Sequence, residues 1–216
     1  MTTAEMLVTS SGREVATETR MVPTHSAPHP VRSAISSPKA ASATPVGSEG
    51  AVAFLGPSTM DMASPGIRTG GILFPVPLTF NEPARGHLVR ASLEAMAYAI
   101  RANLGQIEDL AGVQATDITV GGGMTRTPTW VKILTNVIGR EIRVSHDSSV
   151  SAPVSAMGAY LCACTALGEF PSLQEAALSV RPRLQCLKPD ALASAEYQNH
   201  YERWLQLSVD LQRIDL

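Results

Sequence analysis

Apolar residues recur every three or four positions between Ala84 and Leu110, and this spacing is typical of one face of a long helix. We expect this helix to pack on a sheet. Arg90 and Glu94 are four residues apart in the same stretch, where the expected arrangement is an exposed ion pair on the helix surface. The predicted apolar face consists of Leu93, Met96, Ala97, Ile100, Leu104 and Ile107.

Upstream of this helix, the pattern changes to short apolar runs that glycine and proline interrupt. The first run lies at residues 51–55 and the second at residues 70–77. Apolar runs of this length between turn residues are typical of β-strands, and we predict that these two strands are antiparallel.

From Asp117 onwards, the pattern alternates between strand and helix. A strand that ends at Val120 precedes a helix over residues 128–138, which Gly139 closes, and a second strand follows at residues 142–145. This order of elements predicts an α/β fold.

Three further helices are predicted, over residues 153–167, over residues 173–178 and from about residue 191. Cys162 and Cys164 lie in the first of them, where we expect them to fill the core. The last helix carries a mainly aromatic stripe, which we interpret as core packing rather than a cofactor site. That stripe consists of Tyr197, Tyr201, Trp204 and Leu207.

Three glycines, Gly121, Gly122 and Gly123, join the strand that ends at Val120 to the following helix. Glycine adopts positive φ at little cost and lets a ligand approach the backbone closely. The free N–H groups at the start of a helix favour anionic or polar ligand atoms. A tight turn without a ligand would have the same sequence, so the residues alone leave both interpretations open.

Composition and charge narrow the class of protein. The 216 residues are 44% hydrophobic, enough for the core of one large or two small domains. The net charge of −2 does not favour binding to nucleic acid or to an anionic membrane. Three cysteines do not form a disulfide framework, no signal peptide or membrane span is recognisable, and the expected location is the cytoplasm.

The first fifty residues differ in composition from the rest of the chain. Residues 24–48 are rich in proline, serine, alanine and threonine and have few large apolar residues. Such a composition cannot bury enough apolar surface to fold alone. We therefore expect a disordered leader over residues 1–50 and a folded domain over residues 51–216.

Several ordered blocks of sequence together resemble one known family. They are Gly70-Gly71-Ile72-Leu73-Phe74-Pro75, the run from Arg85 to Glu94, Gly122-Gly123 with Thr127 and Trp130, the run from Ile133 to Gly139, Gly158-Ala159, Gly168-Glu169-Phe170 and the closing tyrosines and tryptophan. This pattern resembles the C-terminal domain of the FGGY family of carbohydrate kinases, which includes xylulokinase-like sugar kinases. The resemblance implies a lobe of the actin-like, ribonuclease-H-like ATPase fold, with helices packed on a mixed sheet.

The resemblance also implies a cofactor and a site. In the family, two lobes close over ATP and a sugar or polyol, and the adenosine belongs to the lobe matched here. Carried over to this sequence, Gly122 and Gly123 would lie under the nucleotide, Gly121 would help the turn, and Thr127 would offer a hydroxyl. Met124 would offer an adaptable apolar surface to the base.

Two parts of the family pattern are not found in residues 1–69: the phosphate loop and the aspartate that acts as general base. We therefore expect a truncated or split kinase, with no catalytic residue and no metal site in this chain, and with Mg²⁺ bound only in a complete active site. The expected partners are a nucleotide and a separate N-terminal lobe or a second copy of the chain.

A second hypothesis is a non-catalytic binding or interaction module that keeps the fold, and a third is a gene remnant. The sequence does not identify the sugar or the polyol.

Overall fold

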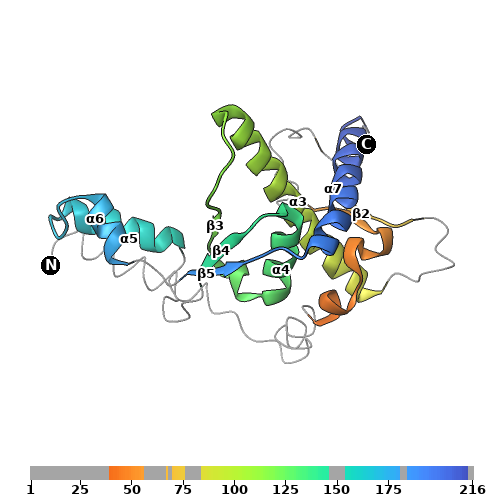
Figure 1. Ribbon diagram of the computed structural model, residues 1–216, viewed down its shortest axis with the longest axis horizontal. Helices are drawn as coiled ribbons and strands as arrows, with labels where there is room; N and C mark the ends of the chain where they lie inside the picture. The colour runs from red at the N-terminus through yellow and green to blue at the C-terminus, as the bar shows by residue number, and fades with distance from the viewer. Residues whose placement is uncertain are drawn as a thin grey trace, which may run out of the picture. The chain divides into compact units, whose positions relative to one another are not determined.

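The computed structural model describes residues 39–55, 67, 70–75, 84–145, 154–180 and 184–213. All of them belong to one compact unit, residues 35–216. In chain order the elements (Figure 1) are the 3₁₀-helix η1 (Val46–Gly50), β1 (Val52–Phe54), β2 (Gly71–Leu73), α3 (Arg85–Ala111), β3 (Thr119–Val120), the 3₁₀-helix η3 (Gly123–Arg126), α4 (Pro128–Ile138), β4 (Ile142–Ser145), α5 (Val154–Ala166), α6 (Leu173–Ser179), β5 (Leu184–Leu187) and α7 (Ala191–Leu211).

The strands form two small sheets. β1 and β2 are antiparallel, as predicted, with Ala53 opposite Ile72. In the second sheet β4 is central, parallel to β3 and antiparallel to β5, so the predicted mixed sheet and α/β fold are confirmed. Strand β5 was not predicted, because its Leu-Gln-Cys-Leu sequence contains no β-branched or aromatic residue.

The main core lies between the helices α3, α4 and α7 and the strands β1 and β4. α4 contributes Leu134 and Val137, which are completely buried, and this agrees with the inward face predicted for it. Trp204 of α7 stacks on Phe54 of β1 with ring centroids 5.7 Å apart, and Tyr197 is fully buried. The interpretation of the aromatic stripe as core packing is therefore confirmed.

The predicted face of α3 is wrong in two respects. Ile100 and Ile107, placed on the apolar face, are 40% and 63% exposed. Arg90 and Glu94, expected on the surface, are 7% and 1% exposed, with Arg90 Nε 2.7 Å from Glu94 Oε1. The reason is that other segments cover this side of α3: the Arg90 guanidinium donates hydrogen bonds to the Ala41 and Thr44 carbonyls and to the Tyr197 hydroxyl oxygen.

The predicted leader also differs from the structure, at residues 39–50. The Gly47 N–H and the Ser48 hydroxyl both donate to the buried carboxylate of Glu94, 3.1 and 2.9 Å away. Gly47, Ser48 and Glu49 have φ of 69°, 52° and 51°, a left-handed turn that costs energy at the two non-glycine positions. This turn therefore depends on its tertiary contacts, which composition does not reveal. The prediction for residues 1–38 lies outside the described residues.

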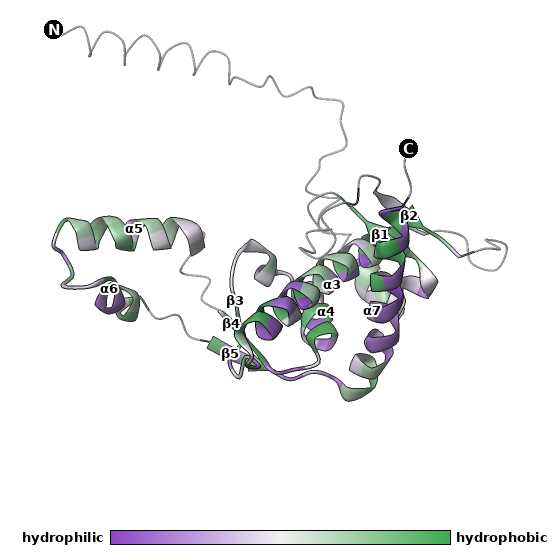
Figure 2. Ribbon diagram, turned by 90° about the horizontal axis from the view of Figure 1, so that it is seen from above, coloured by the Kyte–Doolittle hydropathy of each residue, from purple (hydrophilic) through white to green (hydrophobic). Residues whose placement is uncertain are grey.

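α5 is an apolar helix with little buried surface. Leu161 is buried, whereas Cys162 is exposed and Cys164 is half-buried, so the expectation that both cysteines fill the core is wrong. Figure 2 shows that most of α5 is hydrophobic.

No helix in the described ranges is both long enough and apolar enough to cross a membrane.

Candidate functional site: the glycine loop between β3 and α4

The candidate site is the loop of residues 121–127, which leaves the end of β3 and leads into α4. Gly122 has φ 110° and ψ 175°, a backbone conformation that is essentially restricted to glycine. A side-chain carbon built at Gly122 or at Gly123 would meet nothing within 4 Å. The backbone conformation at residue 122 therefore requires glycine, and there is open space beside both Gly122 and Gly123.

Local hydrogen bonds fix the loop. The Gly122 carbonyl accepts from the Thr125 backbone N–H at 3.2 Å and from the Thr125 hydroxyl at 2.7 Å. The Thr127 N–H donates to the Met124 carbonyl at 3.0 Å. These contacts form η3 over Gly123–Arg126, and α4 begins at Pro128, where the sequence predicts its start.

The start of α4 adds a favourable electrostatic environment. Thr127 is the N-cap residue and Pro128 the first helical residue, and the Thr127 side chain makes no capping hydrogen bond. The first N–H groups of a helix lack partners within the helix, and they carry the positive end of its dipole. This helix end, next to the loop, therefore favours a negative or polar group.

The five residues predicted to contact a nucleotide all lie in this loop, and four of them are exposed. Gly121, Gly122, Gly123 and Met124 are exposed, Met124 by 40%, while Thr127 is half-buried. The segment combines backbone that can be approached closely, an apolar side chain and a hydroxyl.

Two further residues lie in the loop or in the first turn of α4, and the sequence predicts a role in binding for neither of them. Arg126, the last residue of η3, is exposed and is the one basic residue between β3 and α4. Trp130 is 5% exposed, and its indole N–H has no hydrogen-bond partner among the described residues. The position of Arg126 in the glycine loop was the available signal; nothing in the sequence indicates the unpartnered N–H of Trp130.

The described part of the chain holds no group of three or more histidine, cysteine, aspartate or glutamate side chains arranged to hold a metal ion. The loop itself offers backbone groups and threonine hydroxyls rather than carboxylates, which Mg²⁺ prefers. A Mg²⁺ ion at this loop would therefore depend on the nucleotide phosphates and on other groups.

Comparison with known proteins defines the class. The model of the FGGY family of carbohydrate kinases, C-terminal domain, matches residues 37–167, which is more than half of the chain. The chain therefore belongs to the FGGY family of carbohydrate kinases, and the matched part is its C-terminal domain. The match begins within the predicted leader and before the turn at Gly47, in agreement with the packed residues 39–50.

Curated relatives include L-fuculokinase from Escherichia coli K12, 29% identical over 105 residues, and autoinducer-2 kinase from Salmonella paratyphi A, 32% identical over 117 residues. These alignments cover 49% and 54% of this chain but 21% of each relative. The chain thus spans about a fifth of the length of these curated relatives.

Solved structures agree on the fold. Xylulose kinase from Rhodospirillum rubrum has a TM-score of 0.61 and is 22% identical, with 82% of this chain and 34% of that chain covered. Plasmodium falciparum glycerol kinase, solved with ADP, has a TM-score of 0.56 and is 19% identical, with 84% and 34% covered. The fold is therefore that of the sugar kinases, an actin-like ATPase lobe, as predicted.

Proposed function

We propose that this chain is the adenosine-side, ATP-binding lobe of a carbohydrate kinase, an ATP-dependent phosphotransferase that acts on a hydroxyl group of a sugar or polyol. In this proposal Gly121, Gly122, Gly123, Met124 and Thr127 contact the nucleotide. The observation that supports it most is the open glycine loop between β3 and α4, with Gly122 in a conformation restricted to glycine.

The chemistry of the loop suits binding rather than catalysis. Backbone N–H groups, a hydroxyl and an apolar side chain can hold a base and a ribose, and Arg126 adds a positive charge for the phosphates. Phosphoryl transfer also needs a base for the acceptor hydroxyl and charge stabilisation around the γ-phosphate. We propose that a second lobe supplies those groups, and that Mg²⁺ joins with the nucleotide when both lobes close.

The test of the nucleotide site is calorimetry of the full 216-residue chain with MgATP and MgADP, comparing Gly123→Asp with the wild type. Gly123 is not among the residues with positive φ, so the aspartate introduces bulk and negative charge without left-handed strain. We expect the variant to weaken binding at least tenfold, about 1.4 kcal/mol.

The matched control is Gly105→Asp, since Gly105 lies on α3 outside the loop and also has open space around it. The Gly105→Asp variant should bind the nucleotide with the same affinity as the wild type. Equal affinities for all three proteins would contradict the assignment of the loop. No binding to the wild type at millimolar nucleotide would favour the second candidate, a non-catalytic interaction module that retains the fold.

A further inference from the structure

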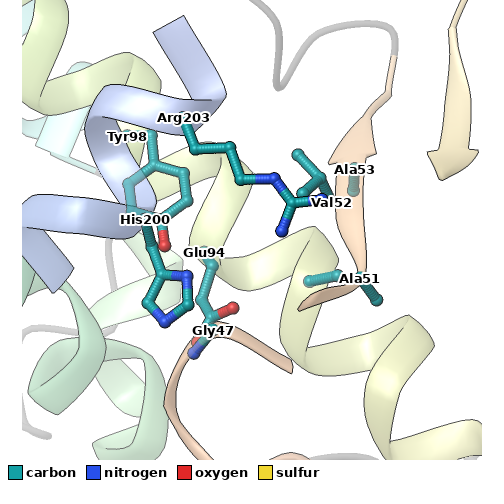
Figure 3. A pocket seen from close by; sticks show the side chains of 9 residues that line it. Gly47, Ala51, Val52, Ala53, Glu94, Tyr98, His200 and Arg203 are labelled. Atoms are coloured by element: carbon teal, nitrogen blue, oxygen red, sulfur yellow. The ribbon is translucent and has the colours of Figure 1, made fainter. Parts of the chain in front are cut away.

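A small cavity lies where η1, β1 and α7 meet α3. Gly47, Glu94, Tyr98 and His200 line it, together with alanines of the η1–β1 segment and of α3. Figure 3 shows that the Tyr98, Glu94 and His200 side chains converge on it from α3 and α7. Its volume is about 10 Å³, which is close to the minimum for one water molecule and too small for a larger ligand.

The Tyr98 hydroxyl has an unmet hydrogen-bonding requirement in this cavity. Tyr98 is 4% exposed, and its hydroxyl oxygen has no partner in the described residues. The neighbouring Tyr197 hydroxyl, by contrast, donates to Glu94 Oε1 at 2.9 Å and accepts from the Arg90 guanidinium at 2.7 Å. A buried hydroxyl without a partner costs free energy, and one that lines a cavity of about the size of a water molecule can recover that cost by binding a water.

The Glu94 carboxylate has room for one more donor. Its Oε1 atom accepts from Arg90 Nε, the Gly47 N–H and the Tyr197 hydroxyl. Its Oε2 atom accepts only from the Ser48 hydroxyl among the described residues. A carboxylate oxygen accepts two or more hydrogen bonds, as Oε1 does here, so Oε2 can accept a second one.

We propose that one internal water molecule occupies this cavity, accepts a hydrogen bond from the Tyr98 hydroxyl and donates one to Glu94 Oε2. The water links the Tyr98 hydroxyl to Glu94, one helical turn earlier on α3, and Glu94 in turn holds the left-handed turn at residues 47–49 directly. It thereby completes a buried polar network that connects Arg90, Glu94, Tyr98 and Tyr197.

The direction in which Tyr98→Phe changes the free energy of unfolding tests this proposal. Removal of a hydroxyl that binds the water should destabilise the fold, whereas removal of an unpartnered buried hydroxyl should stabilise it or have no effect. In urea denaturation of the full chain, we expect Tyr98→Phe to raise the equilibrium constant for unfolding about fivefold.

The matched control is Ser194→Ala. The Ser194 hydroxyl oxygen is also buried without a partner in the described residues, but Ser194 does not line this cavity. We expect Ser194→Ala to leave the unfolding constant unchanged or to lower it. A shift of Tyr98→Phe in the same direction as Ser194→Ala would overturn the proposal.

A crystal structure of the same chain provides an independent measurement. We expect electron density for a water within hydrogen-bonding distance of the Tyr98 hydroxyl and the Glu94 carboxylate, and no such density in Tyr98→Phe. An empty cavity, an ion in place of the water, or density that persists unchanged in Tyr98→Phe would overturn it.

Discussion

At the scale of single residues, Glu94 is the side chain on which most of the buried polar network depends. It is 1% exposed and accepts hydrogen bonds from Arg90, Tyr197, Gly47 and Ser48. Burial raises the pKa of the Tyr197 phenol well above its usual range, and the Glu94 charge raises it further, so the phenol remains a neutral donor. The Glu94 carboxylate thus accepts hydrogen bonds from all four of these donors.

Glu94→Ala should therefore destabilise the fold by about 3–5 kcal/mol, because it leaves the buried Arg90 guanidinium without its counter-charge. Urea denaturation measures the loss. The control is Asp210→Ala, which removes an exposed ion pair with Arg213 and should cost less than about 1 kcal/mol. A similar small loss for both variants would show that the network contributes no more than a surface pair.

The same residues show a limit of sequence analysis. The spacing of Arg90 and Glu94 fits an exposed ion pair, and nothing local distinguishes it from a buried one. Burial results from residues 41–48 and from Tyr197, which are more than forty positions away in sequence. Periodicity describes a single helix, so it cannot show which face a distant segment will cover.

At the scale of elements, Glu108 near the end of α3 and Arg140 just after α4 fix the segment that leads to β3. Arg140 donates to Glu108 through both terminal nitrogens, at 2.7 and 3.2 Å, and the Ala115 N–H donates to the same carboxylate at 2.8 Å. The hydrogen bond from Arg140, followed by that from Ala115, lowers the pKa of Glu108 below its usual value.

This lowered pKa predicts a pH dependence of stability. As pH falls, Glu108 takes up a proton more readily in the unfolded chain than in the folded chain. Its contribution to the free energy of unfolding is therefore fully present above about pH 4.5, and it is lost as pH falls through the lower pKa of the folded chain. Glu108→Gln should unfold at a lower temperature than the wild type at pH 7, and the difference should narrow below pH 4.5. Glu141→Gln, at an exposed neighbour of Arg140, is the control. A difference in melting temperature for Glu108→Gln that stays constant with pH would contradict this account.

Elements with a long apolar period were predictable, and elements without one were not. α4 begins and ends at the predicted residues and α7 begins at its predicted start, because each buries a regular stripe. β5 has no such pattern, and it is a strand because it pairs with β4. In the candidate site, the glycines indicated the loop, whereas the left-handed turn at residues 47–49 is held by contacts that only the folded chain reveals.

At the scale of the whole molecule, the chain covers about a fifth of the length of its curated relatives, and the proposed function assigns phosphoryl transfer to groups that a second lobe supplies. We predict that the purified 216-residue chain gives no ATP-dependent phosphorylation of pentoses, hexoses or polyols. Addition of a polypeptide that carries a phosphate loop and a general-base aspartate should produce turnover, because both sides of the γ-phosphate would then be present. The complemented pair should lose that turnover with Gly123→Asp and keep it with Gly105→Asp. Turnover by the chain alone, at the roughly 1–100 s⁻¹ of ordinary kinases, would show that this lobe already contains the groups assigned to its partner.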